Sequence, residues 1–137
     1  MDDLHDMESL CVGQGLRRAA RTITRRYDAA LRPSGLTLGQ FSILTMTAAA
    51  GPISIGALAA RLGMDRTTMT RDLAPLQRRG LLESLADPKD RRSRKLGATA
   101  EGRRLLQEAL PLWASAQTSS LERVPDWPEL RKRLDEL

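Results

Sequence analysis

The chain of 137 residues has one cysteine, Cys11, and one histidine, His5. A single cysteine excludes a disulfide within the chain. The lone histidine lies near the N-terminus and has no cysteine or histidine partner at a spacing that suits metal ligands. We therefore expect neither a metal site nor a cofactor.

Aromatic residues make up only 3% of the chain, which leaves few side chains on which the bases of a single strand could stack. The sequence also has no Ser, His and Asp set, no glycine loop that would cradle a phosphate, and no paired carboxylates in an apolar setting. We expect no catalytic residues, and an enzyme is the least favoured class.

Long apolar runs are absent as well, and none approaches the length that spans a bilayer. The first residues, Met1-Asp2-Asp3, lack the positive and then apolar pattern of a secretory signal. We expect a cytoplasmic protein without a membrane partner.

What the chain does have is an uneven excess of positive charge, with 22 Lys and Arg against 17 Asp and Glu. Between Arg66 and Lys95, nine cations stand against four anions, so a polyanionic partner is plausible. The length suits one folded unit, or one domain with dimerising arms.

Two helices are predicted in the first 50 residues. Small and large apolar residues recur at steps of three and four from Met7 to Leu31, which predicts one long helix with a seam for a partner helix. Thr37 and Gln40 then form the pattern of a capping box, and the helix that they open should end near Gly51.

A helix-turn-helix follows. Ser54 can cap a helix whose inner stripe includes Ile55, Leu58 and Leu62, and Gly63 is placed to end that helix in a left-handed conformation. Asp65 can then cap a helix that turns Met69, Leu73 and Leu76 inward. The expected outward, DNA-facing residues of that helix are Arg66, Thr67, Thr68, Thr70 and Arg71, and Thr68 also stands where the cap needs it.

The next segment is predicted to be a short hairpin with a cationic loop. Strands are expected over residues 81–85 and 94–98, joined by a loop over residues 87–95, and Gly97 and Ala98 should make the return strand weak. A helix beside such a loop could present donors to base edges and phosphates together, as duplex DNA recognition requires. This geometry is that of a winged helix.

Two helices are predicted at the C-terminus. Thr99 can cap the first, and Asp126 with Glu129 gives the pattern of a capping box for the last. The last helix has an apolar stripe but is too short to be stable alone in water, so we expect it to dock on a partner subunit.

These residues resemble the MarR family of bacterial transcription regulators, from about Leu10 to the C-terminus. Two segments carry the resemblance. They are the helix pair ISIGALAARLGMDRTTMTRDLAPLQRRGLL and the wing DPKDRRSRKLGATAEG, which is similar to the family pattern of Asp-x-Arg followed by Thr-x-x-Gly.

The resemblance implies an all-α protein with a small β-hairpin wing, a six-helix winged helix-turn-helix protomer in a two-fold dimer. Residues 1–35 would form an N-terminal dimerisation helix, residues 36–99 the DNA-binding region, and residues 100–137 the C-terminal dimerisation helices. Such a homodimer would bind a roughly palindromic operator in double-stranded DNA as a repressor and would be released by a small-molecule effector.

The resemblance also implies roles in the wing. Arg92 would enter the minor groove while Asp90 holds its guanidinium, and Arg91, Arg94 and Lys89 would meet phosphates. The competing interpretation of these residues is a solvated, charged hairpin tip.

Three alternatives stay open. Cys11 is a possible redox site, although the position that one branch of the family uses for peroxide sensing is Gly13 here, about 200° around the helix from Cys11. The winged helix could serve protein contact without reading DNA. The arginines of the first helix could bind nucleic acid or an anionic membrane, although a solvated face or the wall of an anion pocket is favoured.

Overall fold

The computed structural model describes residues 4–137, so the Met1-Asp2-Asp3 segment lies outside the described residues. The elements are α1 (Leu4–Leu10), α2 (Val12–Leu31), the 3-10 turn η1 (Arg32–Ser34), α3 (Leu38–Ala50), β1 (Ile53–Ser54), α4 (Ile55–Leu62), α5 (Arg66–Arg78), β2 (Leu82–Asp87), β3 (Asp90–Ala98), α6 (Ala100–Arg123) and α7 (Trp127–Asp135). The mostly helical architecture with a small sheet confirms the predicted fold class.

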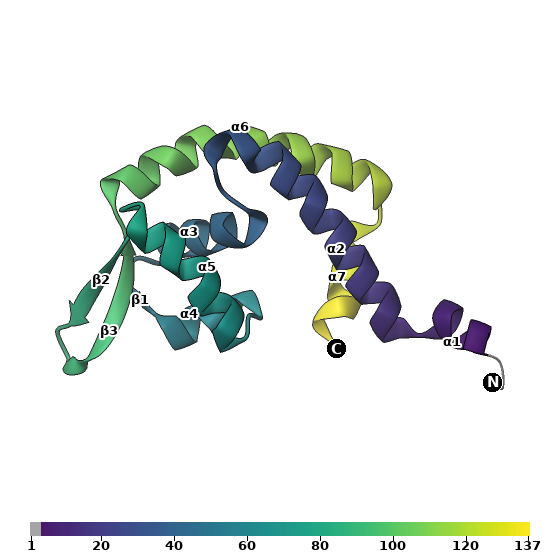
Figure 1. Cartoon of the computed structure of the whole chain (residues 1–137), viewed down its shortest axis with the longest axis horizontal. Coiled ribbons are helices and arrows are strands. Elements are labelled where there is room, and N and C mark those ends of the chain that lie inside the picture. The colour runs from purple at the N-terminus through teal and green to yellow at the C-terminus, as the bar shows by residue number, and fades with distance from the viewer. Residues whose placement is uncertain (1–3) are drawn as a thin grey trace.

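The elements form an arch (Figure 1). Helix α6 runs along its top, α2 descends on one side, and α3, α4, α5 and the sheet make up the other side. None of the helices within residues 4–137 is both long and apolar enough to cross a membrane.

The core lies where α3 meets α4, α5, α6 and the sheet. Leu31, Ile43, Leu44, Leu58 and Met69 are fully buried there. Burial of each such side chain contributes about 1.5–3 kcal/mol. Helices α4 and α5 and the hairpin are therefore fixed to one apolar centre.

Predicted capping signals set most helix ends. Thr37 and Gln40 form the reciprocal capping box, with the Gln40 N–H donating to Thr37 Oγ1 at 3.2 Å. Ser54 accepts a hydrogen bond from the Ala57 N–H, and Gly63 ends α4 with a φ of 62°. These observations confirm the predicted helix starts and the glycine stop.

The prediction of a single N-terminal helix from Met7 to Leu31 is wrong, because Cys11 separates α1 from α2. The backbone of Cys11 is extended, and its Sγ accepts a hydrogen bond from the Gln14 N–H as the cap of a new helix. Gly13 and Gly15 lower the helix propensity at this point. Residues 4–137 thus contain seven α-helices where the sequence predicted six.

The sheet is larger than predicted. It has the order β1-β3-β2, and β1 pairs antiparallel with β3 through Ile53 and Leu96. The return strand, expected to be weak at Gly97 and Ala98, runs through both residues, because they pair with Glu83 and Leu82 of β2 and Gly97 packs against Leu85.

The last helix also differs from the prediction. Asp126 makes no side-chain capping bond, and its carboxylate lies 3.9 Å from Arg133 Nη2 instead. Its backbone is not in the extended conformation that an N-cap needs. The predicted capping box of α7 is therefore wrong.

A tight junction joins α6 to the start of the wing. The Thr99 hydroxyl donates to the Gly80 carbonyl at 2.6 Å and accepts from the Gly102 N–H at 3.0 Å. A Cβ on Gly102 would lie 2.2 Å from the carbonyl oxygen of Leu81. Only glycine fits here, which explains the Thr-x-x-Gly spacing.

We expect Gly102→Ala to lower the free energy of unfolding by about 1–3 kcal/mol, because backbone atoms must shift to admit the methyl group. The matched control is Gly15→Ala, since nothing lies within 4 Å of a Cβ there. That control should raise stability by about 0.5–1 kcal/mol through helix propensity. Urea denaturation measures both, and equal effects would contradict the proposed clash.

Candidate nucleic-acid interface

The sequence of α5 separates an inner face from an outer one. Met69, Leu73 and Leu76 are buried against the core, as predicted. The outward residues Arg66, Thr67, Thr70 and Arg71 are exposed, and Thr68 is half-buried. The structure thus brings the predicted residues together on one helix, with four of them facing solvent.

The polar groups of this face remain mostly available. Arg66 makes no ion pair with any residue of 4–137, and Arg71 Nε lies 3.7 Å from Asp72 Oδ1 with the Arg71 side chain 73% exposed. Such an exposed pair is weak. The Thr70 hydroxyl donates to the Arg66 carbonyl at 2.9 Å, which leaves its methyl group and its lone pairs for a ligand.

Asp65 fixes the beginning of the helix. Its Oδ1 accepts a hydrogen bond of 2.7 Å from the Thr68 N–H, which confirms the predicted cap. Hydrogen bonds from the backbone and side chain of Thr68 lower the pKa of the Asp65 carboxyl below its ordinary value of 3.8. The carboxylate is therefore charged at neutral pH and stabilises the first turn of α5.

The wing differs from the expected long loop. Strands β2 and β3 continue almost to the tip, so that only Pro88 and Lys89 connect them. Asp87 Oδ1 accepts from the Lys89 N–H, and Asp90 Oδ1 accepts from the Arg92 N–H, each at 3.0 Å. These short side-chain to backbone bonds let the chain turn tightly.

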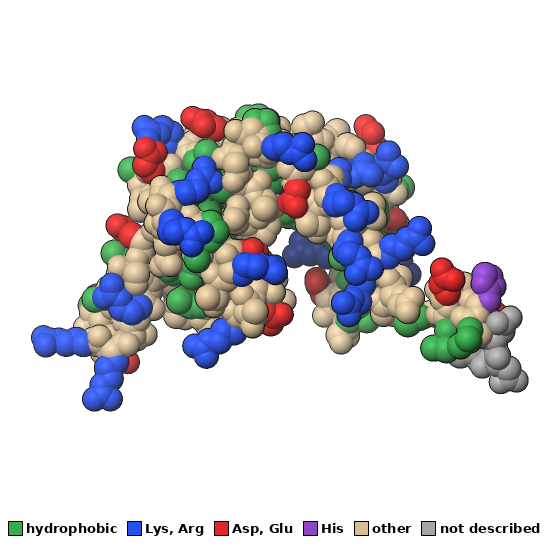
Figure 2. All heavy atoms as spheres, in the orientation of Figure 1, with side chains coloured by type: hydrophobic (Ala, Val, Ile, Leu, Met, Phe, Trp, Pro, Cys, Tyr) green, Lys and Arg blue, Asp and Glu red, His purple; other side chains and the backbone are tan. Residues whose placement is uncertain are grey.

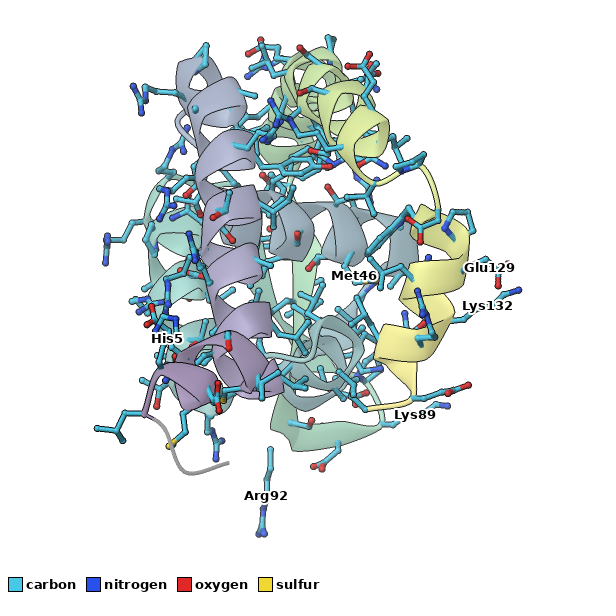
Figure 3. All side chains as sticks on the ribbon, turned by 90° about the vertical axis from the view of Figure 1, so that its right-hand side faces the viewer. His5, Met46, Lys89, Arg92, Glu129 and Lys132 are labelled. Carbon is cyan, nitrogen blue, oxygen red and sulfur yellow. The ribbon has the colours of Figure 1, made fainter. Side chains whose placement is uncertain are left out.

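The Asp90 contact modifies the role implied by the family resemblance. Asp90 holds the backbone of Arg92, whereas the expectation was a contact with its guanidinium. Arg91 and Arg92 are exposed, and neither makes an ion pair within the described part of the chain. Figure 3 shows Arg92 pointing away from the body at the outer end of the wing.

Arg94 and Lys95 have partners within the wing. Arg94 donates from Nε to Ser84 Oγ at 3.1 Å and from Nη2 to the Ser84 carbonyl at 3.0 Å. Lys95 Nζ lies 4.0 Å from Asp87 Oδ2. These cations join β3 to β2, so Arg94 offers a phosphate only its remaining N–H groups.

The cations of the wing and of α5 lie on the same part of the molecule. Figure 2 shows Lys and Arg side chains on the projecting hairpin and on the helices beside it, at the open end of the arch in Figure 1. This arrangement suits a large polyanion that contacts both elements.

One residue of this surface was missed. Ile55 was predicted on the inner stripe of α4, yet its side chain is 38% exposed and lines a groove between α4 and α5. Its periodicity matched a buried position, and no sequence signal marked it otherwise. It is the first residue of α4.

Cys11, the possible redox residue, lies far along the chain from these elements, at the break between α1 and α2. It is exposed, and a Cβ on Gly13 would lie 3.9 Å from its Sγ. A sensing role for Cys11 stays a prediction.

The fold and the site define a class: a winged helix-turn-helix protein whose helix and wing present cations on one surface. The model of the MarR family matches residues 36–93. Transcriptional regulator HosA of Escherichia coli O111:H- is 30% identical over 109 residues, which cover 80% of this chain and 79% of that protein.

Solved structures of transcriptional regulators are also similar to this chain. The transcriptional regulator MosR of M. tuberculosis, crystallised in complex with DNA, is 42% identical, with a TM-score of 0.82 and coverage of 93% of this chain and 92% of that one. CouR of Rhodococcus jostii RHA1, bound to p-coumaroyl-CoA, is 30% identical, with a TM-score of 0.73 and coverage of 91% and 88%. The chain belongs to the MarR family of transcription regulators, which confirms the resemblance.

We expect Asp65→Ala to destabilise the protein at pH 7 and to lose this effect in acid. Because the folded-state pKa is lowered, the stabilisation is fully present above the ordinary value of 3.8 and is lost progressively as the pH falls from that value through the lower folded-state pKa. Urea denaturation from pH 7 to pH 3 measures the difference. The control Asp126→Ala removes an aspartate that makes no capping bond and should show no such convergence. A pH-independent difference for Asp65→Ala would contradict the capping role.

Proposed function

We propose that the protein is a homodimeric repressor in the cytoplasm that binds a roughly palindromic operator in double-stranded DNA and is released by a small molecule. The observation that carries the proposal is the presence of an exposed polar helix face and an exposed cationic wing tip on one surface. Membership of the MarR family supports it.

In this proposal, α5 enters the major groove, which is about 12 Å wide and admits a helix. Arg66 and Arg71 pair with guanine through two N–H groups each. The methyl groups of Thr67 and Thr70 contact thymine. These contacts read base edges, and Thr68, whose N–H is bonded to Asp65, supports the first turn of the helix.

The wing supplies the second group of contacts. Arg92 enters the minor groove, where a narrow A·T tract concentrates negative potential and a weakly hydrated guanidinium is favoured. Side chains alternate along a strand, so Arg91 lies on the other face and reaches phosphate together with Lys89. Asp90 fixes the backbone of Arg92, and Arg94 keeps the hairpin rigid with N–H groups left for phosphate.

The arms are proposed to dimerise, with residues 1–35 and 100–137 forming the interface and residues 36–99 binding DNA. Support comes from apolar side chains that are exposed at the end of the arch away from the wing. They are Leu4, Met7, Leu10, Val12, Leu16, Leu121, Trp127 and Leu137. A scattered exposed leucine is ordinary, but this clustering is typical of a buried subunit interface.

The effector is proposed to bind where α2, α3 and α6 pack together. Three buried polar atoms on these helices have no hydrogen-bond partner among the described residues, namely Arg26 Nε, Thr45 Oγ1 and Ser120 Oγ. Buried polar groups are costly when they stay unpaired, so a bound polar molecule would relieve the cost. The complex of CouR with p-coumaroyl-CoA supports a small-molecule effector.

The proposal is tested with Arg92→Ala and an operator selected from the organism's own genomic fragments. We expect operator binding to weaken by about 1–3 kcal/mol, because the variant lacks the minor-groove guanidinium. Titration at fixed salt measures the affinity, and sedimentation checks that the dimer is intact.

Arg104→Ala is the matched control, because Arg104 belongs to α6 and not to α5 or the hairpin, and its guanidinium is paired with Glu101. The control should bind as the unchanged protein does. Unchanged affinity of Arg92→Ala would remove the wing from the interface, and failure of the unchanged protein to select any duplex would overturn the proposed function.

A further inference from the structure

A groove runs between α4 and α5 on the surface assigned to DNA. Its lining consists of Ile55, Gly56 and Ala59 from α4 and Arg66, Met69 and Thr70 from α5, and it encloses about 490 Å³. A second, shallow hollow is lined by Arg66, Thr67, Thr70 and Arg71. The two hollows share Arg66 and Thr70, so the groove is continuous with the outward face of α5.

The floor of the groove is apolar and its rim is polar. Met69 is fully buried beneath it, Ala59 is half-buried, and Ile55 is 38% exposed. Among residues 36–98, every one of which the structure describes, Ile55 is the most exposed large apolar side chain. An apolar side chain on a surface otherwise built for hydrogen bonds and charges calls for an apolar group on the partner.

The chemistry of the rim favours a DNA base over a protein segment. A protein helix in a groove uses several apolar anchors, whereas this groove offers one exposed branched side chain beside a guanidinium and a hydroxyl. On the major-groove edge of DNA, the thymine C5-methyl is the apolar group, and it lies among hydrogen-bonding atoms. Its apolar character and its polar setting match the lining of the groove.

We propose that this groove is a thymine-methyl subsite and that Ile55 is a specificity-determining residue. Ile55 and Ala59 contact the C5-methyl of one thymine in each half-site, while Arg66 and Thr70 contact the polar edges of the adjoining base pair. The inference rests on the proposed function, since it requires α5 to lie in the major groove.

The test replaces each thymine of the selected operator, one at a time, by deoxyuridine, which differs only in lacking the methyl group. At one position in each half-site, we expect the unchanged protein to bind about fourfold more weakly, the loss that corresponds to one buried methyl group. Titration at fixed salt gives the ratio of the two affinities.

Two variants then test whether the fourfold loss of affinity depends on the groove. Ile55→Ala removes the contact, and Gly56→Leu fills the groove from a position where an added Cβ meets nothing within 4 Å. Both should bind the thymine and deoxyuridine operators equally at that position. Ala57→Leu is the control, because Ala57 is exposed on the same helix but does not line the groove, and it should keep the fourfold ratio.

Circular dichroism checks that each variant is folded. The two groove variants change the groove in opposite ways, since Ile55→Ala removes volume and Gly56→Leu adds it, so a shared loss of the affinity ratio is not explained by one packing defect. The proposal is overturned if no deoxyuridine changes the affinity, or if Ile55→Ala and Gly56→Leu keep the unchanged ratio. Either result leaves operator binding itself intact, whereas a protein that binds no duplex at all refutes the proposed function.

Discussion

The junction between the wing and α6 is the constraint on which the rest of the structure depends. The Thr99 N–H donates to the Leu81 carbonyl at 3.1 Å, and the absence of a side chain on Gly102 lets α6 begin directly against that carbonyl. Helix α6 then packs along α2, with Tyr27 hydrogen-bonded to Gln117. The surface proposed to read DNA and the arms proposed to dimerise are therefore held in one fixed relation, which a two-fold protein needs if its half-sites are to be separated by a set distance.

The cations of residues 32–99 divide into two groups. Some stabilise the fold: Arg79 donates to the carbonyls of Gly35 and Ser34, and Arg94 joins the two long strands of the wing. Others, such as Arg66 and Arg92, project without an ion pair among the described residues. Net charge alone cannot make this distinction. This division of the cations into two groups explains how a basic segment can be both rigid and free to contact a polyanion.

Much of the fold could be predicted because capping and glycine signals are local. Thr37, Asp65 and Thr99 each satisfy an N–H group three residues away, and this spacing is visible in the sequence. Some errors, such as the helix break at Cys11, were local, and others arose where distant contacts decide the outcome. Pairing with β2 extends β3 to the tip of the wing, and Ile55 lines a groove between α4 and α5 and stays partly exposed. The outward face of α5 followed from its period, whereas the role of Arg94 within the wing depends on Ser84 across the hairpin.

The central claim is that α5 and the wing contact adjacent grooves of one duplex, twice per dimer. Footprinting of the selected operator tests it most directly, with methylation of guanine N7 reporting the major groove and hydroxyl radicals reporting the sugars of the minor groove. The account predicts two major-groove protections about one duplex turn apart, each flanked by a minor-groove protection on its outer side. A single protected patch, or major-groove protection without the flanking minor-groove signal, would contradict it.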